Sequence, residues 1–578
     1  DRGYLFGGSG TLTVACSLSG NHSLTVDTQG MGTAGCVILA ADNSYSGETR
    51  ILSGASLAVG AGETAGTLGT GVVVNEGTLT FNRTDRVTAG NAISGTGNLV
   101  QKGSGELVLT GNNSYTGVTR IAVGTLTVGD GGTSGSLGTG AVVNNGVLVF
   151  NRSDAVVFNT AVSGTGALVK NGSGTLTIQK QLSYTGGTTV NEGTLVLSKG
   201  GANGIIQGDL SIQEGAQVTL KGGNSFGSSG GIASVKGVNI NGGTLYFGDK
   251  NNQVCKYMTF NLTGGVVDGV AGGRMDIAMG TSIEVKAADK ASEIRNINVQ
   301  LKDSYPSIFR VARGTAVSDL NVSANIVNSS GVKGALTKTG NGIMVLSGKN
   351  TYSGGTTVEL GTLVAASSQA LGTGQAMVDS DGCLVLGGTG ADAPGISLGN
   401  NILVKNGGVL TGSATLTGNT TMESGSIFEL TLSIGGSAGD ELACNSLMLR
   451  SGVFRIDAGA MLKLAALTID YSTDFWNTSH ILNFIDGGDN ATLTGNFTLD
   501  TSAAGDYSAY GEWSLQKSED SKDMNMVWTP NAAPEVSSAL TAAFTATAPL
   551  PVPEPSAAVL MLAAAGAAFL RRSVPRNR

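Results

Sequence analysis

The fold of this chain is decided by a phrase that it repeats, and the clearest copy reads Gly105-Glu106-Leu107-Val108-Leu109-Thr110-Gly111-Asn112-Asn113-Ser114-Tyr115-Thr116-Gly117. The copy continues to Gly124-Thr125-Leu126-Thr127-Val128. Leu107 and Leu109 occupy alternate positions, which is the period of a β-strand that buries one face. The glycines and asparagines around them tolerate the positive φ of tight corners. The phrase therefore predicts short strands joined by tight turns.

Further copies follow at a constant offset, since Tyr115 returns as Tyr184 and Phe81 returns at the same distance as Phe150. A distant copy surrounds Tyr352, and a weaker one surrounds Tyr45. The residues that define the phrase across its copies are Tyr45, Gly47, Leu107, Leu109, Tyr115, Gly117, Gly124, Leu126, Leu176, Tyr184, Gly186, Gly193, Leu195, Leu346, Tyr352, Gly354, Gly361 and Leu363.

Strands this short bury a face only when neighbouring coils stack, so the repeat predicts an all-β, right-handed parallel β-solenoid, or β-helix. Dividing the repeat into three rungs gives about 23 residues per rung. An array of β-sandwiches is the alternative, and it is less favoured because a single repeat is short for a sandwich.

The repeats and the composition divide the chain into six segments. We expect a solenoid with 69-residue repeats over 1–200, degenerate rungs over 201–330, a solenoid with a further clear repeat over 331–400, terminal rungs and a cap over 401–530, a linker over 531–550 and a sorting signal with a short apolar helix over 551–578. The cap is expected where all three tryptophans fall, at Trp476, Trp513 and Trp528.

The repeated phrase resembles the autotransporter-associated β-strand repeat, which occurs in the passenger regions of secreted bacterial proteins. The resemblance covers the body of the chain, and the copy at Tyr184 departs from it by lacking the asparagine two residues before the tyrosine. It implies an exported, structural or adhesin-like solenoid at the cell surface or in the extracellular matrix. An extracellular polysaccharide or a host glycan is the partner that it implies.

The C-terminal residues carry a second resemblance. Pro553-Glu554-Pro555 precede the uncharged run 556–569, and Arg571 and Arg572 follow it. These features resemble a PEP-CTERM tail, which implies an export signal upstream of Asp1 and processing at the membrane by an exosortase-like enzyme. A helix of roughly 21 Å is shorter than a bilayer core of about 30 Å, so transient anchoring in the cell envelope is favoured over a permanent span. A buried C-terminal helix of the fold is the alternative.

Composition excludes several classes of protein. Glycine supplies 91 of the 578 residues, but proline supplies only 9 and glycine does not recur at every third position, so collagen is excluded. Apolar residues recur regularly and the net charge is only −8, so a disordered chain is not expected. No basic face with interleaved aromatic residues is present, so nucleic acid is not an expected partner.

Residues with metal or redox chemistry are few, and neither a metal nor a cofactor is expected. Cys16 and Cys36 either stack closely enough for a disulfide or are two small core residues, and the second interpretation is favoured. His22 and His480 have no metal-ligand spacing, so packed or surface positions are expected. The segment Asp486-Gly487-Gly488-Asp489-Asn490 is either a calcium loop or a plain turn, with the turn favoured.

The acidic residues do not predict a catalytic pair. Asp85 and Asp154 occupy equivalent places, each two residues after an arginine (Arg83 and Arg152), and one period of three rungs would separate them by roughly 14 Å. A glycosidase needs its two carboxyl groups about 5 to 9.5 Å apart, so each aspartate is instead expected to form a surface ion pair with its arginine.

Two further features leave alternatives open. Asp379 and Asp381 lie close together but have no partner that the sequence identifies. The recurring tyrosines form either a strip for stacking sugars or aromatic corners that close each rung, and the corner interpretation is favoured.

The sequence thus favours an exported structural or adhesin-like solenoid over an enzyme. The alternative is a secreted polysaccharide-active enzyme that cleaves glycans on the same scaffold. That alternative requires two or more carboxylates and a basic residue in one groove.

Replacing Pro553, Glu554 and Pro555 by alanine in the producing bacterium is expected to leave an unprocessed, membrane-retained precursor, because the processing enzyme would lose its recognition motif. Peptide mass spectrometry of the C-terminus together with membrane fractionation measures this, with Pro549→Ala as the control outside the motif. Normal processing of the triple variant would contradict the sorting interpretation.

Overall fold

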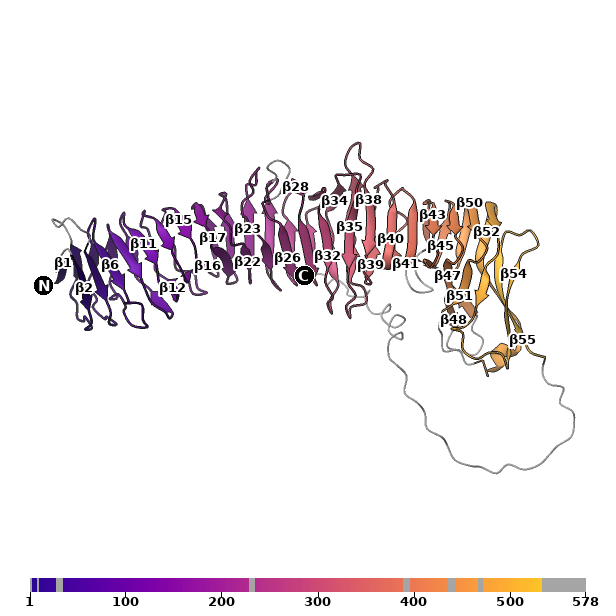
Figure 1. Ribbon diagram of the computed structural model, residues 1–578, viewed down its shortest axis with the longest axis horizontal. Coiled ribbons are helices and arrows are strands. Elements are labelled where there is room, and N and C mark those ends of the chain that lie inside the picture. The colour runs from indigo at the N-terminus through magenta and orange to yellow at the C-terminus, as the bar shows by residue number, and fades with distance from the viewer. Residues whose placement is uncertain are drawn as a thin grey trace, which may run out of the picture. The chain divides into compact units, whose positions relative to one another are not determined.

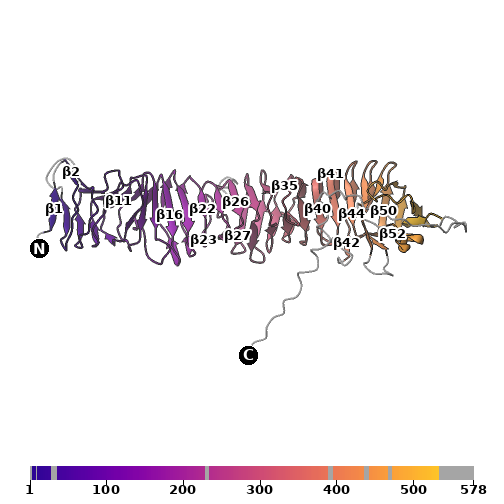
Figure 2. The ribbon, with the colours of Figure 1, turned by 90° about the horizontal axis from the view of Figure 1, so that it is seen from below.

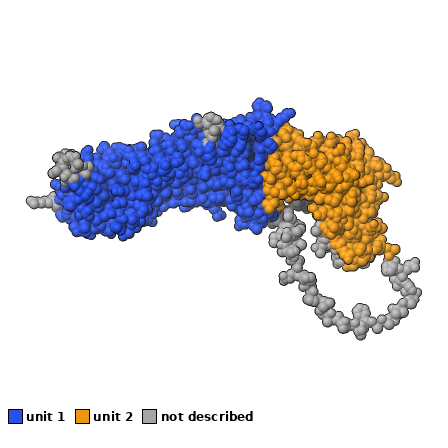
Figure 3. Space-filling view, in the orientation of Figure 1, with its two compact units in different colours: residues 1–334 blue, residues 335–578 orange. Residues whose placement is uncertain are grey.

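The computed structural model describes residues 3–7, 10–27, 35–227, 234–387, 395–434, 442–465 and 471–532. The chain divides into two compact units, residues 1–334 and residues 335–578 (Figure 3). Strands of successive turns lie side by side and pair in parallel within each unit, so the chain is an all-β parallel β-solenoid (Figure 1, Figure 2). The expected linker beyond residue 532 and the whole expected tail helix lie outside the described residues.

In unit 1 the strands lie on up to three sides of a turn, and strands that pair along one side form a parallel ladder that we name by its first strand. The β1 ladder contains β1 (Tyr4–Gly7), β3 (Leu24–Asp27), β5 (Thr49–Ile51), β7 (Val73–Asn75) and β10 (Ile93–Ser94). The β2 ladder contains β2 (Thr11–Val14), β4 (Cys36–Leu39), β6 (Ser56–Val59), β8 (Thr78–Phe81), β11 (Asn98–Gln101), β13 (Thr119–Ile121), β15 (Val142–Asn144), β18 (Val162–Gly164) and β21 (Ser183–Tyr184).

Three more ladders complete unit 1. The β9 ladder contains β9 (Val87–Ala89), β12 (Glu106–Leu109), β14 (Thr125–Val128), β16 (Val147–Asn151), β19 (Ala167–Asn171), β22 (Thr188–Val190), β24 (Leu210–Ile212), β26 (Gly237–Asn241), β29 (Thr259–Thr263), β32 (Ser282–Val285) and β35 (Pro306–Val311). The β17 ladder contains β17 (Ala155–Phe158), β20 (Thr175–Ile178), β23 (Thr194–Ser198), β25 (Gln217–Lys221), β27 (Thr244–Phe247), β30 (Val266–Gly269), β33 (Ser292–Ile294) and β36 (Leu320–Val322). The β28 ladder contains β28 (Asn252–Cys255), β31 (Arg274–Ile277), β34 (Asn298–Leu301) and β37 (Asn325–Asn328).

The length of a turn differs from the single value that the sequence predicts. Leu107 pairs with Leu126, and Leu126 pairs with Leu148, so the second of these turns is longer than the first. Leu210 pairs with Val238, which makes that turn longer than either. The predicted rung length of about 23 residues is therefore wrong as a constant, because corner segments lengthen some turns and not others.

The 69-residue repeat is also not a whole number of turns. Leu107 and Leu176 are equivalent positions of the repeat. Three turns after Leu107, however, the residue in register with it is Leu168 and not Leu176. Leu176 follows eight residues later and belongs to β20, in the β17 ladder. Each repeat thus covers about three and a third turns and shifts its pattern to the next side, because all three sides accept the same short strand and corner.

Stacked leucines form the core. Leu107, Leu126, Leu148 and Leu168 succeed one another in register, and each has no exposed side-chain surface. Burying one such side chain stabilises the fold by about 1.5–3 kcal/mol. A single turn has no partner for this surface, so the contacts between neighbouring turns supply the core.

Unit 2 also pairs its strands in parallel ladders, but several of its strands are longer than those of unit 1. Its elements are β38 (Ala335–Thr339), β39 (Ile343–Leu346), β40 (Thr356–Ala365), β41 (Ala376–Leu386), β42 (Ile396–Leu398), β43 (Ile402–Val404), β44 (Val409–Gly412), β45 (Ala414–Leu416), β46 (Thr420–Met422), β47 (Ile427–Leu430), β48 (Leu432–Ile434), β49 (Leu442–Cys444), β50 (Leu447–Ile456), β51 (Met461–Leu464), the 3-10 helix η1 (Asp474–Asn477), β52 (His480–Thr494), β53 (Thr498–Asp500), β54 (Gly511–Lys517) and β55 (Met524–Pro530). Within the described ranges, no helix is both long enough and apolar enough to cross a bilayer.

The last strands of unit 2 change direction. β52 pairs in parallel with β50 and antiparallel with β55, which in turn pairs antiparallel with β54 (Figure 1). Trp476, Trp513 and Trp528 gather beside this hairpin, and the indole Nε1 of Trp528 donates a hydrogen bond to the Trp476 carbonyl at 2.8 Å. The hairpin ends the parallel ladder, and the buried rings cover apolar interior there.

Gly138→Ala is expected to destabilise its turn by about 1–3 kcal/mol, because the new methyl group would lie 2.5 Å from the Tyr115 ring of the preceding turn. Gly132→Ala is the matched control, since its nearest neighbour would be the Asp130 carboxylate at 3.5 Å. Amide hydrogen exchange around Tyr115 measures the effect locally, as a solenoid opens turn by turn. Equal rates of amide hydrogen exchange around Tyr115 in the two variants would contradict the close packing of Gly138 on Tyr115.

Candidate functional site

The tyrosines of the repeated phrase lie inside the solenoid. None of the four has exposed surface, and burial raises the pKa of each hydroxyl. Each hydroxyl is hydrogen bonded to the threonine four residues on, at 2.5 to 2.8 Å, in the pairs Tyr45–Thr49, Tyr115–Thr119, Tyr184–Thr188 and Tyr352–Thr356. The rings therefore close corners, and the sugar-stacking strip is excluded.

These corners also face different sides. Thr49 belongs to β5 in the β1 ladder, Thr119 to β13 in the β2 ladder and Thr188 to β22 in the β9 ladder. Equivalent residues of successive repeats are thus not stacked above one another. A continuous strip of equivalent side chains along one face does not form in these repeats.

The asparagine two residues before the tyrosine joins three turns. The amide N–H of Leu18 donates to Asn43 Oδ1 at 2.8 Å, and Asn43 Nδ2 donates to the Thr67 carbonyl at 2.6 Å. Asn113 makes the same two kinds of bond. Where the phrase lacks this asparagine, Leu182 is fully buried in its place. The asparagine is therefore a structural bridge in the copies that contain it.

The recurring Arg-Asp pairs are structural as well. Arg83 donates two hydrogen bonds of 2.8 Å to Asp85 and a third, also 2.8 Å, to the carbonyl of Gly66. The expected pairing is confirmed, and the pair lies at the edge of the fold, because only 8% of the Arg83 side chain is exposed but 39% of the Asp85 side chain is. Arg152 pairs with Asp154 in the same way. The arginine hydrogen bonds hold the pKa of both aspartates below the ordinary value.

Other carboxylates are also engaged by bases. Burial would raise the pKa of Asp268, but hydrogen bonds from Asn296 and Arg295 lower it on balance. Asp379 pairs with Lys405 at 2.7 Å, which corrects the expectation that it has no partner.

Among the described residues the aspartates with a shifted pKa are Asp85, Asp154, Asp268, Asp500 and Asp520, and all are shifted downward. A glycosidase acid needs the opposite shift.

The histidines pack against aromatic rings. His22 meets Tyr4 edge to face with ring centroids 5.9 Å apart, and His480 stacks on Phe475 at 4.1 Å. Over the described ranges, no cluster of three or more histidine, cysteine, aspartate or glutamate side chains has the arrangement to hold a metal ion.

Two interpretations from the sequence are corrected. Cys36 pairs in register with Thr11, so Cys16 lies five residues past the position opposite Cys36. The two cysteines form no disulfide, and both thiols are free. Cys16 is exposed, so it is not a core residue either. The segment 486–490 is part of strand β52, where the register with β50 shifts, and is neither a turn nor a calcium loop.

A buried donor at one corner was missed from the sequence. Gln101, Lys170 and Lys338 occupy the same place in three copies and are each at most 2% exposed. Lys170 Nζ donates to the carbonyls of Asn171 at 2.8 Å and Gly172 at 2.5 Å, while Gln101 Nε2 donates to two carbonyls at 2.9 Å. Burial lowers the pKa of Lys170 to about 8. The spacing of Gln101 and Lys170, which equals the repeat offset, was the available signal.

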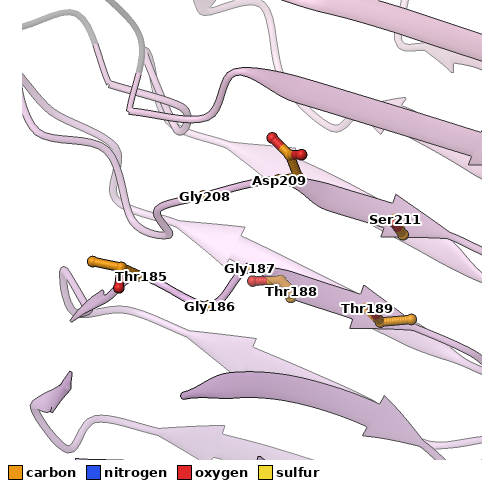
Figure 4. A pocket seen from close by; sticks show the side chains of 8 residues that line it. All are labelled: Thr185, Gly186, Gly187, Thr188, Thr189, Gly208, Asp209 and Ser211. Carbon is orange, nitrogen blue, oxygen red and sulfur yellow. The ribbon is translucent and has the colours of Figure 1, made fainter. Parts of the chain in front are cut away.

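A polar cleft of about 370 Å³ opens beside the Tyr184 copy (Figure 4). Its lining residues are Thr185, Gly186, Gly187, Thr188, Thr189, Gly208, Asp209 and Ser211. The glycines leave room because they have no side chains, and Asp209 is the one charged residue in the lining. Asp209 Oδ1 accepts the Gly237 N–H at 2.9 Å. The cleft offers hydroxyl groups and a carboxylate, but no base or aromatic ring.

Comparison with known proteins gives the repeats a family. The passenger-associated-transport-repeat family matches residues 34–59, 99–128, 168–197 and 336–365, which contain the four signature tyrosines. The chain carries autotransporter-type passenger repeats. Outside these ranges, the family match makes no statement about the chain.

Two relatives extend the comparison. The "Adhesin BmaC autotransporter" of Brucella suis biovar 1 (strain 1330) is 33% identical over 249 residues, which cover 39% of this chain but only 7% of that protein. The crystal structure of the Haemophilus influenzae Hap adhesin aligns with 88% of this chain and 64% of that chain, at 12% identity and a TM-score of 0.27. A similarity that low carries no argument about the fold.

Lys170→Met is expected to destabilise its corner by about 1–3 kcal/mol, because buried carbonyls would lose their donor. Lys170→Gln is the matched control and should stay near the wild type, since Gln101 already makes such bonds at the equivalent corner. Hydrogen exchange in β19 and β22 measures both. If the methionine variant exchanged no faster than the glutamine variant, the structural role of the donor would be contradicted.

Proposed function

We propose that the chain is the passenger-type solenoid of an exported, surface-associated bacterial protein that acts as an adhesin. The observation that carries this proposal is the fourfold match to passenger-associated transport repeats within a parallel solenoid. The adhesin relative supports it over 249 residues. The repeated residues are used for stacking, so binding falls to the exposed and unrepeated residues of the corners and faces.

The location follows from the same proposal. The protein is placed at the cell surface or in the extracellular matrix, with transient anchoring in the envelope through its C-terminal tail. The support for an exosortase-like processing enzyme is the motif Pro553-Glu554-Pro555 with Arg571 and Arg572. An extracellular polysaccharide or host glycan is the proposed partner, and the absence of a basic, aromatic face in the sequence argues against nucleic acid.

No observation favours the glycan-cleaving alternative. Such an enzyme needs one carboxyl group with a raised pKa and a second one within reach of the same sugar ring. The shifted aspartates of the described residues all have lowered pKa values, and Asp85, Asp154 and Asp268 are held by arginines.

Antibody against unit 1 is expected to label intact cells of the producing bacterium, and protease added outside those cells should remove the label. A periplasmic protein in the same cells serves as the control for intact envelopes. A strain without this chain should attach less to the surface that the wild type colonises. Labelling only after permeabilisation, or unchanged attachment, would contradict the proposal.

A further inference from the structure

One corner of unit 1 exposes large side chains in three successive turns. The segments Lys256–Met258, Ala278–Thr281 and Lys302–Tyr305 follow β28, β31 and β34 in register, and together we call them the Tyr257 corner. Tyr257 is 44% exposed, Met279 is 41% exposed and Tyr305 is 71% exposed. The Tyr257 amide donates to the Met279 carbonyl at 3.1 Å, so these two residues are direct neighbours.

Tyr257 is held in one position by its backbone and its neighbours. Its φ of 55° lies in the left-handed region, which a residue of this size adopts only when its surroundings impose it. The ring packs on the bare backbone of Gly280, where a methyl group would come within 2.9 Å of Cε1. The Lys256 ammonium lies 5.4 Å from the ring centroid and fixes the ring further.

A carboxylate in the same corner has an unused acceptor. Asp303 Oδ2 is screened from water and accepts no hydrogen bond within the described residues. A ligand hydroxyl group does not reach this buried oxygen, so Asp303 contributes its charge to the corner and not a hydrogen bond. An acidic ligand would bring a like charge to this carboxylate.

The size of the corner favours a chain-like ligand over a protein. Since an aromatic side chain covers about 150–250 Å², the exposed parts of these three residues amount to roughly 300 Å². A stable protein pair buries about 800 Å² on each partner. Two turns separate Tyr257 from Tyr305, a rise of about 10 Å, which suits two rings stacking on one extended sugar chain.

We propose that the Tyr257 corner binds an extended neutral polysaccharide, with Tyr257 and Tyr305 stacking on sugar rings. The inference rests on the proposed surface function and names the ligand class and the residues that would recognise it. The 201–330 segment has no repeated phrase, so the site belongs to residues that the repeat does not constrain.

Affinity electrophoresis of the full chain in gels that contain hydroxyethylcellulose, galactomannan, dextran or alginate tests the proposal. The wild type should be retarded by at least one of the three neutral polysaccharides and not by alginate. Tyr305→Ala and Tyr257→Ala should each weaken retardation about tenfold, whereas Tyr305→Phe should retain it because the ring remains.

Tyr510→Ala is the matched control, because Tyr510 is 43% exposed but lies in unit 2. The proposal is overturned if no neutral polysaccharide retards the wild type, if alginate alone does, or if Tyr510→Ala weakens binding as much as Tyr305→Ala. It is also overturned if the corner variants change self-association and not polysaccharide binding. Any of these results would overturn the binding role of the Tyr257 corner only. The proposed surface location would still be tested separately, by the labelling of intact cells.

Discussion

The rest of this structure depends on one constraint: each turn hydrogen bonds in register to the next, with a spacing of about 4.8 Å between neighbouring strands. At this spacing, a side chain at the corner of one turn must leave room for the backbone of the next turn. A methyl group at Gly138 would leave no such room, because it would clash with Tyr115. The stacking also leaves carbonyls at the corners that need donors. Asn43, Gln101 and Lys170 supply those donors from inside the fold.

The sequence repeat serves this stacking and does not build a binding face. Because it covers about three and a third turns, Thr49, Thr119 and Thr188 lie in three different ladders. Every side of the solenoid therefore receives the same interior pattern in turn. The proposed recognition therefore uses residues outside the pattern, such as the exposed Tyr257 and Tyr305, which lie two turns apart at one corner.

The sequence predicted the parts that periodicity controls. The alternation of Leu107 and Leu109 predicted buried strands, and the corner role of Tyr115 followed from its recurrence. Turn length was not predictable, because a repeat offset does not reveal how many corners it contains. Asp486 was misjudged since glycine-rich segments also form irregular strands. The Tyr257 corner was missed because neither its left-handed backbone nor its exposure leaves a repeated signal.

The repeat shifts by one side per copy, and spin labels at Arg120→Cys and Thr189→Cys test this shift most directly in a Cys16→Ser background. These positions are equivalent in the repeat and lie in the β2 and β9 ladders. Paramagnetic resonance should show no dipolar broadening for this pair, but strong broadening for Val169→Cys with Thr189→Cys, which are neighbours in register. Strong broadening for the first pair, at about 14 Å, would mean three whole turns per repeat and contradict the account.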